Sequence, residues 1–169
     1  MQVHDIMTEP PQTCPRTMHL PDASRRMREN GCGSLVVLGP RGRIAGIVTD
    51  RDLALALGAH RDAKPLTVER VMSQPVHMCR PDDDVTVALG RMASVHVRRL
   101  PVVDTDGDIK GLISIDDIVL WGLQSSGVSM HALIASLRSL CAASGFAARE
   151  YAADNSSELM RRVSSDRSR

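Results

Sequence analysis

An internal repeat constrains this chain more than any other feature. A shift of 65 positions takes Met7 to Met72 and Asp52 to Asp117, with no gap between them. So long a match without a gap would not arise by chance, so we interpret the chain as two tandem copies of one unit. The same shift joins further identical residues, namely Pro10 and Pro75, Cys14 and Cys79, Ala23 and Ala88, Arg26 and Arg91, Met27 and Met92, Leu35 and Leu100, Gly42 and Gly107, Ile44 and Ile109, and Gly46 and Gly111.

The local pattern within each copy predicts the order strand, helix, strand, strand, helix. Apolar side chains fall on one face of the first helix, a short apolar run follows, and a glycine-containing turn leads into the next strand. In the first copy the predicted elements are a helix over 21–30 ended by Gly31, strands over 34–38 and 43–48, and a helix over 50–57 ended by Gly58.

The second copy repeats this order with a stronger turn signal. Thr86 is expected to start its first helix, and the Asp82 to Asp84 run complements the positive end of that helix. The predicted elements are a helix over 85–95, strands over 100–103 and 109–114 joined at Asp106-Gly107, and a helix over 115–121 ended by Gly122.

A unit of three short strands and two helices cannot cover both faces of its own sheet, whereas two units packed together can. The sequence therefore predicts an α+β fold of two tandem β-α-β-β-α repeats packed sheet to sheet, plus a C-terminal helix. The expected divisions are 1–64 for the first repeat with its linker, 65–125 for the second repeat, 126–145 for the helix, and 146–169 for a polar, flexible tail.

The C-terminal helix carries an apolar stripe whose role the sequence leaves open. It packs back on its own module, or it forms a dimer contact, because an apolar stripe beyond two complete repeats needs a surface to cover it. The stripe consists of Met130, Leu133, Ile134, Leu137, Leu140 and Cys141.

Composition excludes several classes of protein. The formal net charge is +1, and the only aromatic residues are Trp121, Phe146 and Tyr151, so neither a basic field nor a stacking platform favours nucleic acid. No apolar run is long enough for a membrane helix, and no export signal opens the sequence. Four widely spaced cysteines then indicate reduced thiols, and the chain is predicted to be cytoplasmic.

The segment "GIVTDRD" of the first copy returns in the second as "GLISIDD". In isolation, Thr49 with Asp52 is a helix cap, although Asp reaches back less well than Glu. The alternative is a nucleoside site, because a helix start offers free N–H groups and a carboxylate can bind a ribose diol. The recurrence of the pair as Ser114 with Asp117 favours the site. Gly46 and Gly111 give further support, since a strand glycine often marks close approach of a ligand or backbone.

Positive charge for a phosphate is unequal between the copies. Arg98 and Arg99 precede the second copy's strand, whereas Gly33 and Ser34 hold the matching positions of the first. The guanidinium group of arginine can donate two parallel hydrogen bonds to a phosphate. Arg51 inside the first motif is a further candidate for binding it. The six histidines never coincide under the 65-residue shift, so no metal site is predicted. No nucleophile stands in a recognised motif with a base partner, so no catalytic residue is predicted.

These residues resemble the cystathionine-beta-synthase (CBS) domain, which is called a Bateman module when paired. The resemblance rests on "VHDIMTEP" and "VERVMSQP", on "SLVVLGPRGRIAGIVTDRDL", and on "RRLPVVDTDGDIKGLISIDDI". It implies a disc-like homodimer that binds AMP, ADP, ATP, S-adenosylmethionine or a dinucleotide such as NAD in clefts between the copies. No cofactor is required, and the adenine nucleotide is a regulatory ligand.

By this resemblance, Thr49 and Asp52 hold the ribose in one cleft, and Ser114 and Asp117 hold it in the other. Arg98 and Arg99 are expected to face the Thr49 and Asp52 cleft, so the two clefts should be unequal. The leading function is a non-enzymatic ligand sensor that acts on an unidentified effector protein. The alternatives are a structural dimerisation module with vestigial clefts, or an enzyme that uses a nucleotide as substrate.

Overall fold

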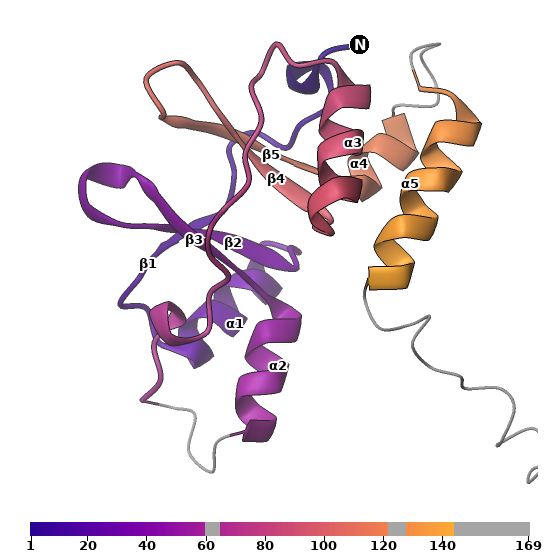
Figure 1. Cartoon of the computed structure of the whole chain (residues 1–169). Coiled ribbons are helices and arrows are strands. Elements are labelled where there is room, and N and C mark those ends of the chain that lie inside the picture. Colours follow the sequence, from indigo (N-terminus) through magenta and orange to yellow (C-terminus); the bar gives the residue numbers. More distant parts are fainter. Residues whose placement is uncertain (60–64, 122–127, 144–169) are drawn as a thin grey trace, which may run out of the picture.

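The computed structural model describes residues 1–59, 65–121 and 128–143, and it contains the predicted unit twice (Figure 1). The first copy consists of β1 (Thr13–Pro15), α1 (Leu20–Glu29), β2 (Ser34–Leu38), β3 (Ile44–Thr49) and α2 (Asp50–Ala59). The second copy consists of α3 (Val85–Val95), β4 (Arg99–Val103), β5 (Ile109–Ser114) and α4 (Ile115–Trp121), and α5 (Met130–Ala143) follows it. Short 3-10 turns lie at Val3–Asp5, Pro40–Gly42 and Val68–Arg70.

The two sheets lie in the middle of the molecule, with α1 and α2 outside one and α3, α4 and α5 outside the other (Figure 1). β1 pairs parallel to β2, which pairs antiparallel to β3. β4 and β5 form the second hairpin, and a single parallel bridge from Cys79 to Val102 takes the place of β1 there. This arrangement confirms the predicted α+β fold of two tandem repeats packed sheet to sheet.

Each copy is completed by the opening segment of the other. Val3 is buried in the core of the second copy, and Val68 is buried in the core of the first. Thr8 N donates to Leu112 O at 2.9 Å, and Ser73 N donates to Ile47 O at 2.8 Å. The pair of copies is therefore the folding unit, as the sheet-covering argument requires.

Helix ends differ from the predictions in two places. Gly58 does not end α2, which continues to Ala59, because Gly58 has no positive φ and stays helical. Thr86 does not cap α3, because the N-cap is Asp84, whose carboxylate accepts from Thr86 N at 2.8 Å. Gly31, with φ of 59°, ends α1 as predicted. Gly122 lies outside the described residues.

The predicted C-terminal helix is present as α5 and packs on its own module. Leu133 and Leu140 are buried in the core of the second copy, together with Val128, and Leu137 packs against it. Ser139 Oγ donates to Ala93 O of α3 at 3.3 Å. The other half of the predicted stripe remains exposed, and the predicted tail lies outside the described residues.

Candidate ligand sites of the two repeats

The first repeated motif forms a reciprocal helix cap. Thr49 N and Thr49 Oγ1 both donate to Asp52 Oδ2, at 2.8 and 2.7 Å. Asp52 N donates in return to Thr49 Oγ1 at 3.3 Å. The capping interpretation is thus confirmed, and the short Asp side chain does reach back to the backbone N–H of the N-cap residue.

The second motif repeats this geometry. Ser114 N and Ser114 Oγ donate to Asp117 Oδ2 at 2.8 and 2.6 Å, and Asp117 N donates to Ser114 Oγ at 3.2 Å. In both motifs the cap engages Oδ2 alone. Within residues 1–59, 65–121 and 128–143, neither Oδ1 atom has a hydrogen-bond partner, so half of each carboxylate is available to a further donor.

The strand glycines of the motifs are explained by methionine packing. A Cβ added to Gly46 would lie 2.5 Å from Met72 Sδ, and one added to Gly111 would lie 2.5 Å from Met7 Sδ. The side chain that approaches each glycine comes from the opening segment of the other copy. The close approach that the sequence predicted at these glycines is thus made by the protein itself, and a role of the glycines toward a ligand stays a prediction. The signal that could have revealed the packing is the matched pair Met7 and Met72.

The three candidate arginines lie in different surroundings. Arg98 Nη2 lies 3.8 Å from Asp116 Oδ1 of its own copy, and both side chains are mostly exposed. Arg99 instead reaches the first copy. A Cβ added to Gly33 would lie 3.5 Å from Arg99 Nη2 and 3.2 Å from Asp50 Oδ2. Arg51 is exposed on the first turn of α2. The structure thus brings Arg99, but not Arg98, to the start of α2, where the first motif lies.

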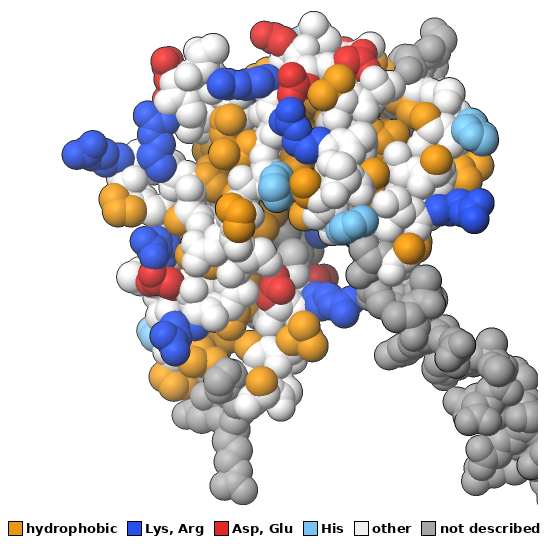
Figure 2. Space-filling model, in the orientation of Figure 1, with side chains coloured by type: hydrophobic (Ala, Val, Ile, Leu, Met, Phe, Trp, Pro, Cys, Tyr) orange, Lys and Arg blue, Asp and Glu red, His pale blue; other side chains and the backbone are white. Residues whose placement is uncertain are grey.

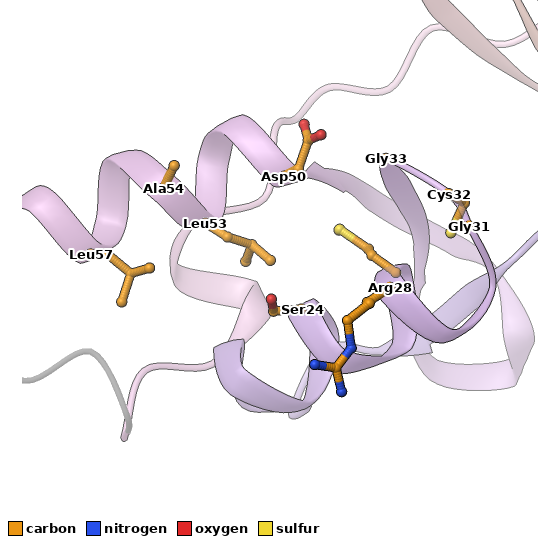
Figure 3. A pocket seen from close by; sticks show the side chains of 10 residues that line it. Ser24, Arg28, Gly31, Cys32, Gly33, Asp50, Leu53, Ala54 and Leu57 are labelled. Atoms are coloured by element: carbon orange, nitrogen blue, oxygen red, sulfur yellow. The ribbon is translucent and has the colours of Figure 1, made fainter.

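A pocket of about 540 Å³ opens between α1 and α2 of the first copy (Figure 3). Leu53 and Leu57 line it from α2, and Ser24 and Arg28 line it from α1. Asp50 also lines it, whereas neither Thr49 nor Asp52 does. Sequence reasoning missed this pocket.

Two of the cysteines are unsuited to nucleophilic chemistry. Burial raises the pKa of the Cys14 thiol to about 11 and that of the Cys79 thiol to about 12, and only the thiolate is a good nucleophile. The described residues contain no group of three or more His, Cys, Asp or Glu residues that could hold a metal ion. On the face shown in Figure 2, basic and acidic side chains are interspersed with apolar ones.

Two β/α units that complete each other's cores and carry the same helix-start motif define a tandem repeat module. The family model of the CBS domain matches residues 3–59 and 68–123, and the chain belongs to this family. No helix among the described residues is long and apolar enough to cross a membrane.

Relatives share this module in different contexts. An uncharacterized 17.7 kDa protein of Acidianus ambivalens is 36% identical over 97 residues, which are 57% of this chain and 58% of that protein. The L-aspartate semialdehyde sulfurtransferase of Methanosarcina acetivorans is 30% identical over 116 residues, 69% of this chain but 23% of that enzyme. The match thus spans a little over half of one relative and about a quarter of the other, and the module occurs in enzymes as well.

A solved structure has the same fold and contains ligands. The CBS domain pair of protein MJ0100, in complex with 5′-methylthioadenosine and S-adenosyl-L-methionine, matches with a TM-score of 0.66 and 25% identity. The match covers 74% of this chain and 98% of that one.

Proposed function

We propose that this chain is a regulatory module that binds adenosine-containing ligands in the clefts between its two repeats. The observation that carries the proposal is the twin cap, in which the helix start is built twice with the same hydroxyl and carboxylate. In each, Oδ2 is used by the protein and Oδ1 is left for a ligand. The MJ0100 pair supports the ligand class, because both of its ligands contain adenosine.

Each cleft would recognise the nucleoside through its ribose. A ribose diol donates to a carboxylate, and Oδ1 of Asp52 or Asp117 is the available acceptor. Thr49 and Ser114 hold these carboxylates in place from the end of the preceding strand. The cap and the binding site are therefore two uses of one arrangement.

The two clefts would differ in their preference for phosphate. Arg99 reaches the start of α2, and Arg51 lies on its first turn, so the Thr49 and Asp52 cleft is the one we assign to AMP, ADP or ATP. Arg98 would need to leave the exposed ion pair with Asp116, which costs little. The Ser114 and Asp117 cleft would accept an uncharged nucleoside such as 5′-methylthioadenosine.

The chain would act as a sensor, not as an enzyme. A ligand shifts a conformational equilibrium by its differential affinity for two states, and the shift would be passed to an effector protein, with the module itself a homodimer. The second candidate is a structural module with vestigial clefts. It is favoured by the closed hydrogen-bonding of the caps, which hold α2 and α4 without any ligand.

Titration calorimetry with AMP and with 5′-methylthioadenosine tests the proposal. We expect Asp52→Ala to weaken AMP binding at least tenfold and Asp117→Ala to weaken it by less than twofold. Arg99→Gln should weaken AMP but leave 5′-methylthioadenosine unchanged, because only AMP carries a phosphate. Asp84→Ala is the matched control, since it removes a carboxylate cap from α3 outside both motifs.

Thermal unfolding distinguishes the sensor from the structural module. A ligand at 100 times its Kd should add about 2.7 kcal/mol to the free energy of unfolding. No response to AMP, ADP, ATP, S-adenosylmethionine or NAD would support vestigial clefts. Equal losses of AMP affinity in Asp52→Ala and Asp117→Ala would refute the inequality of the clefts.

A further inference from the structure

The start of α2 places a carboxylate beside the arginine that we assign to the phosphate of the ligand. A Cβ added to Gly33 would lie 3.2 Å from Asp50 Oδ2 and 3.5 Å from Arg99 Nη2, so the two side chains border one small space. Arg99 forms no ion pair within residues 1–59, 65–121 and 128–143. Its guanidinium is therefore unpaired and within reach of the Asp50 carboxylate.

The two oxygens of Asp50 have different surroundings. Arg51 N donates to Oδ1 at 2.8 Å, whereas Oδ2 lies on the side of Gly33 and Arg99. Figure 3 shows the carboxylate at the start of α2, pointing away from Leu53. Asp50 is exposed and Arg99 is half-buried, so a ligand group can approach both side chains from solvent.

The backbone at this position does not require a carboxylate. The 65-residue shift takes Asp50 to Ile115, which is 1% exposed in the core of the second copy. Asp50 N donates to Gly33 O at 3.1 Å, and Ile115 N donates to Arg98 O at 2.9 Å. Both residues therefore leave their strand in the same way, and only the first copy adds a negative charge there.

A carboxylate at this place affects a ligand according to the charge of the ligand. A phosphate bound by Arg99 would lie close to Asp50, and the two negative groups would compete for one guanidinium. ATP carries more negative charge than AMP and would be repelled more, whereas adenosine carries none. An acidic residue in the first turn also complements the helix dipole, but this effect stabilises α2 equally whichever ligand is bound.

We propose that Asp50 is a specificity-determining residue of the Thr49 and Asp52 cleft, where it limits the negative charge of the nucleotide that the cleft accepts. Its carboxylate competes with the phosphate of the ligand for Arg99, so the cleft prefers a nucleoside monophosphate to a triphosphate. This inference rests on the proposed function, in which Arg99 meets the phosphate.

Titration calorimetry of the full chain with adenosine, AMP and ATP tests this role. All variants carry Asp117→Ala, so that binding is measured at the first cleft. In this background we expect AMP to bind more tightly than ATP. Asp50→Asn should tighten AMP binding at least fivefold and ATP binding at least tenfold, and should change the affinity for adenosine by less than twofold. Asparagine keeps the shape of the side chain and can still accept from Arg51 N, so the variant should fold.

Two further variants separate competition for Arg99 from a general effect of charge. Asp22→Asn is the matched control, because it removes the same charge from the first turn of α1, where Asp22 pairs with Arg25. It should change each of the three affinities by less than twofold. In an Arg99→Gln chain, the gain in AMP affinity from Asp50→Asn should fall below twofold, because no guanidinium is left to compete for.

The outcomes distinguish a failure of this inference from a failure of the proposed function. If none of the three ligands binds to the Asp117→Ala chain, the proposed function fails at this cleft, and the inference fails with it. If AMP binds but Asp50→Asn changes the AMP and adenosine affinities alike, only the inference fails. A first cleft that prefers ATP to AMP, or a gain in AMP affinity that persists in the Arg99→Gln chain, would also overturn it.

Discussion

The two copies share one fold but differ in what covers their helices. In the second copy, α5 lies on α3 and buries Leu89 to 2% exposure, whereas Ser24 at the equivalent position of the first copy is exposed. The difference is local, since the hairpins keep equivalent registers, with an irregularity after Val37 in one and after Val102 in the other. Duplication therefore preserved the sheets and the helix-start motifs, while the outer surface of the helices diverged.

The opening segments did not diverge in this way, because each one packs against the other copy through the same contact. Met7 lies against Gly111, and Met72 lies against Gly46. This exchange ties the copies into one cooperative unit, so we expect damage to either copy to lower the stability of the whole. Three sets of substitutions test how far the copies are equivalent.

The largest difference in stability between equivalent substitutions is expected at the position of α3 that α5 covers. Leu89→Ala should lower the free energy of unfolding by about 2–5 kcal/mol, because it leaves a cavity between α3 and α5. The equivalent change in the first copy, Ser24→Ala, should alter it by less than about 0.5 kcal/mol. Urea unfolding at a fixed, low protein concentration measures both. Similar losses in the two variants would mean that the first-copy surface is also covered in the isolated chain.

A smaller effect is expected where the copies meet. Gly46→Ala should cost about 1–3 kcal/mol, because the new Cβ overlaps the side chain of Met72. Met72→Ala in the same chain should remove that overlap, so the double variant should lose less than the sum of the single losses. Gly58→Ala is the control, as no atom lies within 4 Å of its added Cβ. Additive losses in the urea unfolding of the double variant would contradict the packing account.

The repeat predicted much of this architecture from the sequence. Because each residue could be checked against its counterpart, the helices, hairpins and helix-start motifs were placed within a residue or two. The exchange of opening segments was not predictable in this way, since Val3 and Val68 are alike and either core could accept either one. The pocket was missed because it lies between α1 and α2, whose spacing is set by tertiary packing and not by the pattern of either helix. The roles of Thr49, Asp52, Ser114 and Asp117 toward a ligand stay a prediction.

The smallest change in the free energy of unfolding is expected at the N-caps of α1 and α3. Asp84 caps α3 through its carboxylate, whereas its counterpart His19 occupies the N-cap of α1 in the same extended conformation without a side-chain hydrogen bond. His19→Asp should therefore raise the free energy of unfolding by about 0.5–1 kcal/mol, and Asp84→Ala should lower it by about 1 kcal/mol.

The pH dependence of the Asp84→Ala variant tests whether the cap stabilises the fold through the charge of the carboxylate. Hydrogen bonds from Thr86 hold the pKa of the Asp84 carboxyl below its usual range. The cap thus stabilises the fold above the unfolded pKa of about 4, and its contribution is lost as the pH falls through the lower folded pKa. Thermal unfolding at pH 7 and pH 3 should show the Asp84→Ala deficit shrinking at the lower pH. A deficit that stays the same at both values would mean that Asp84 acts through packing and not through its charge.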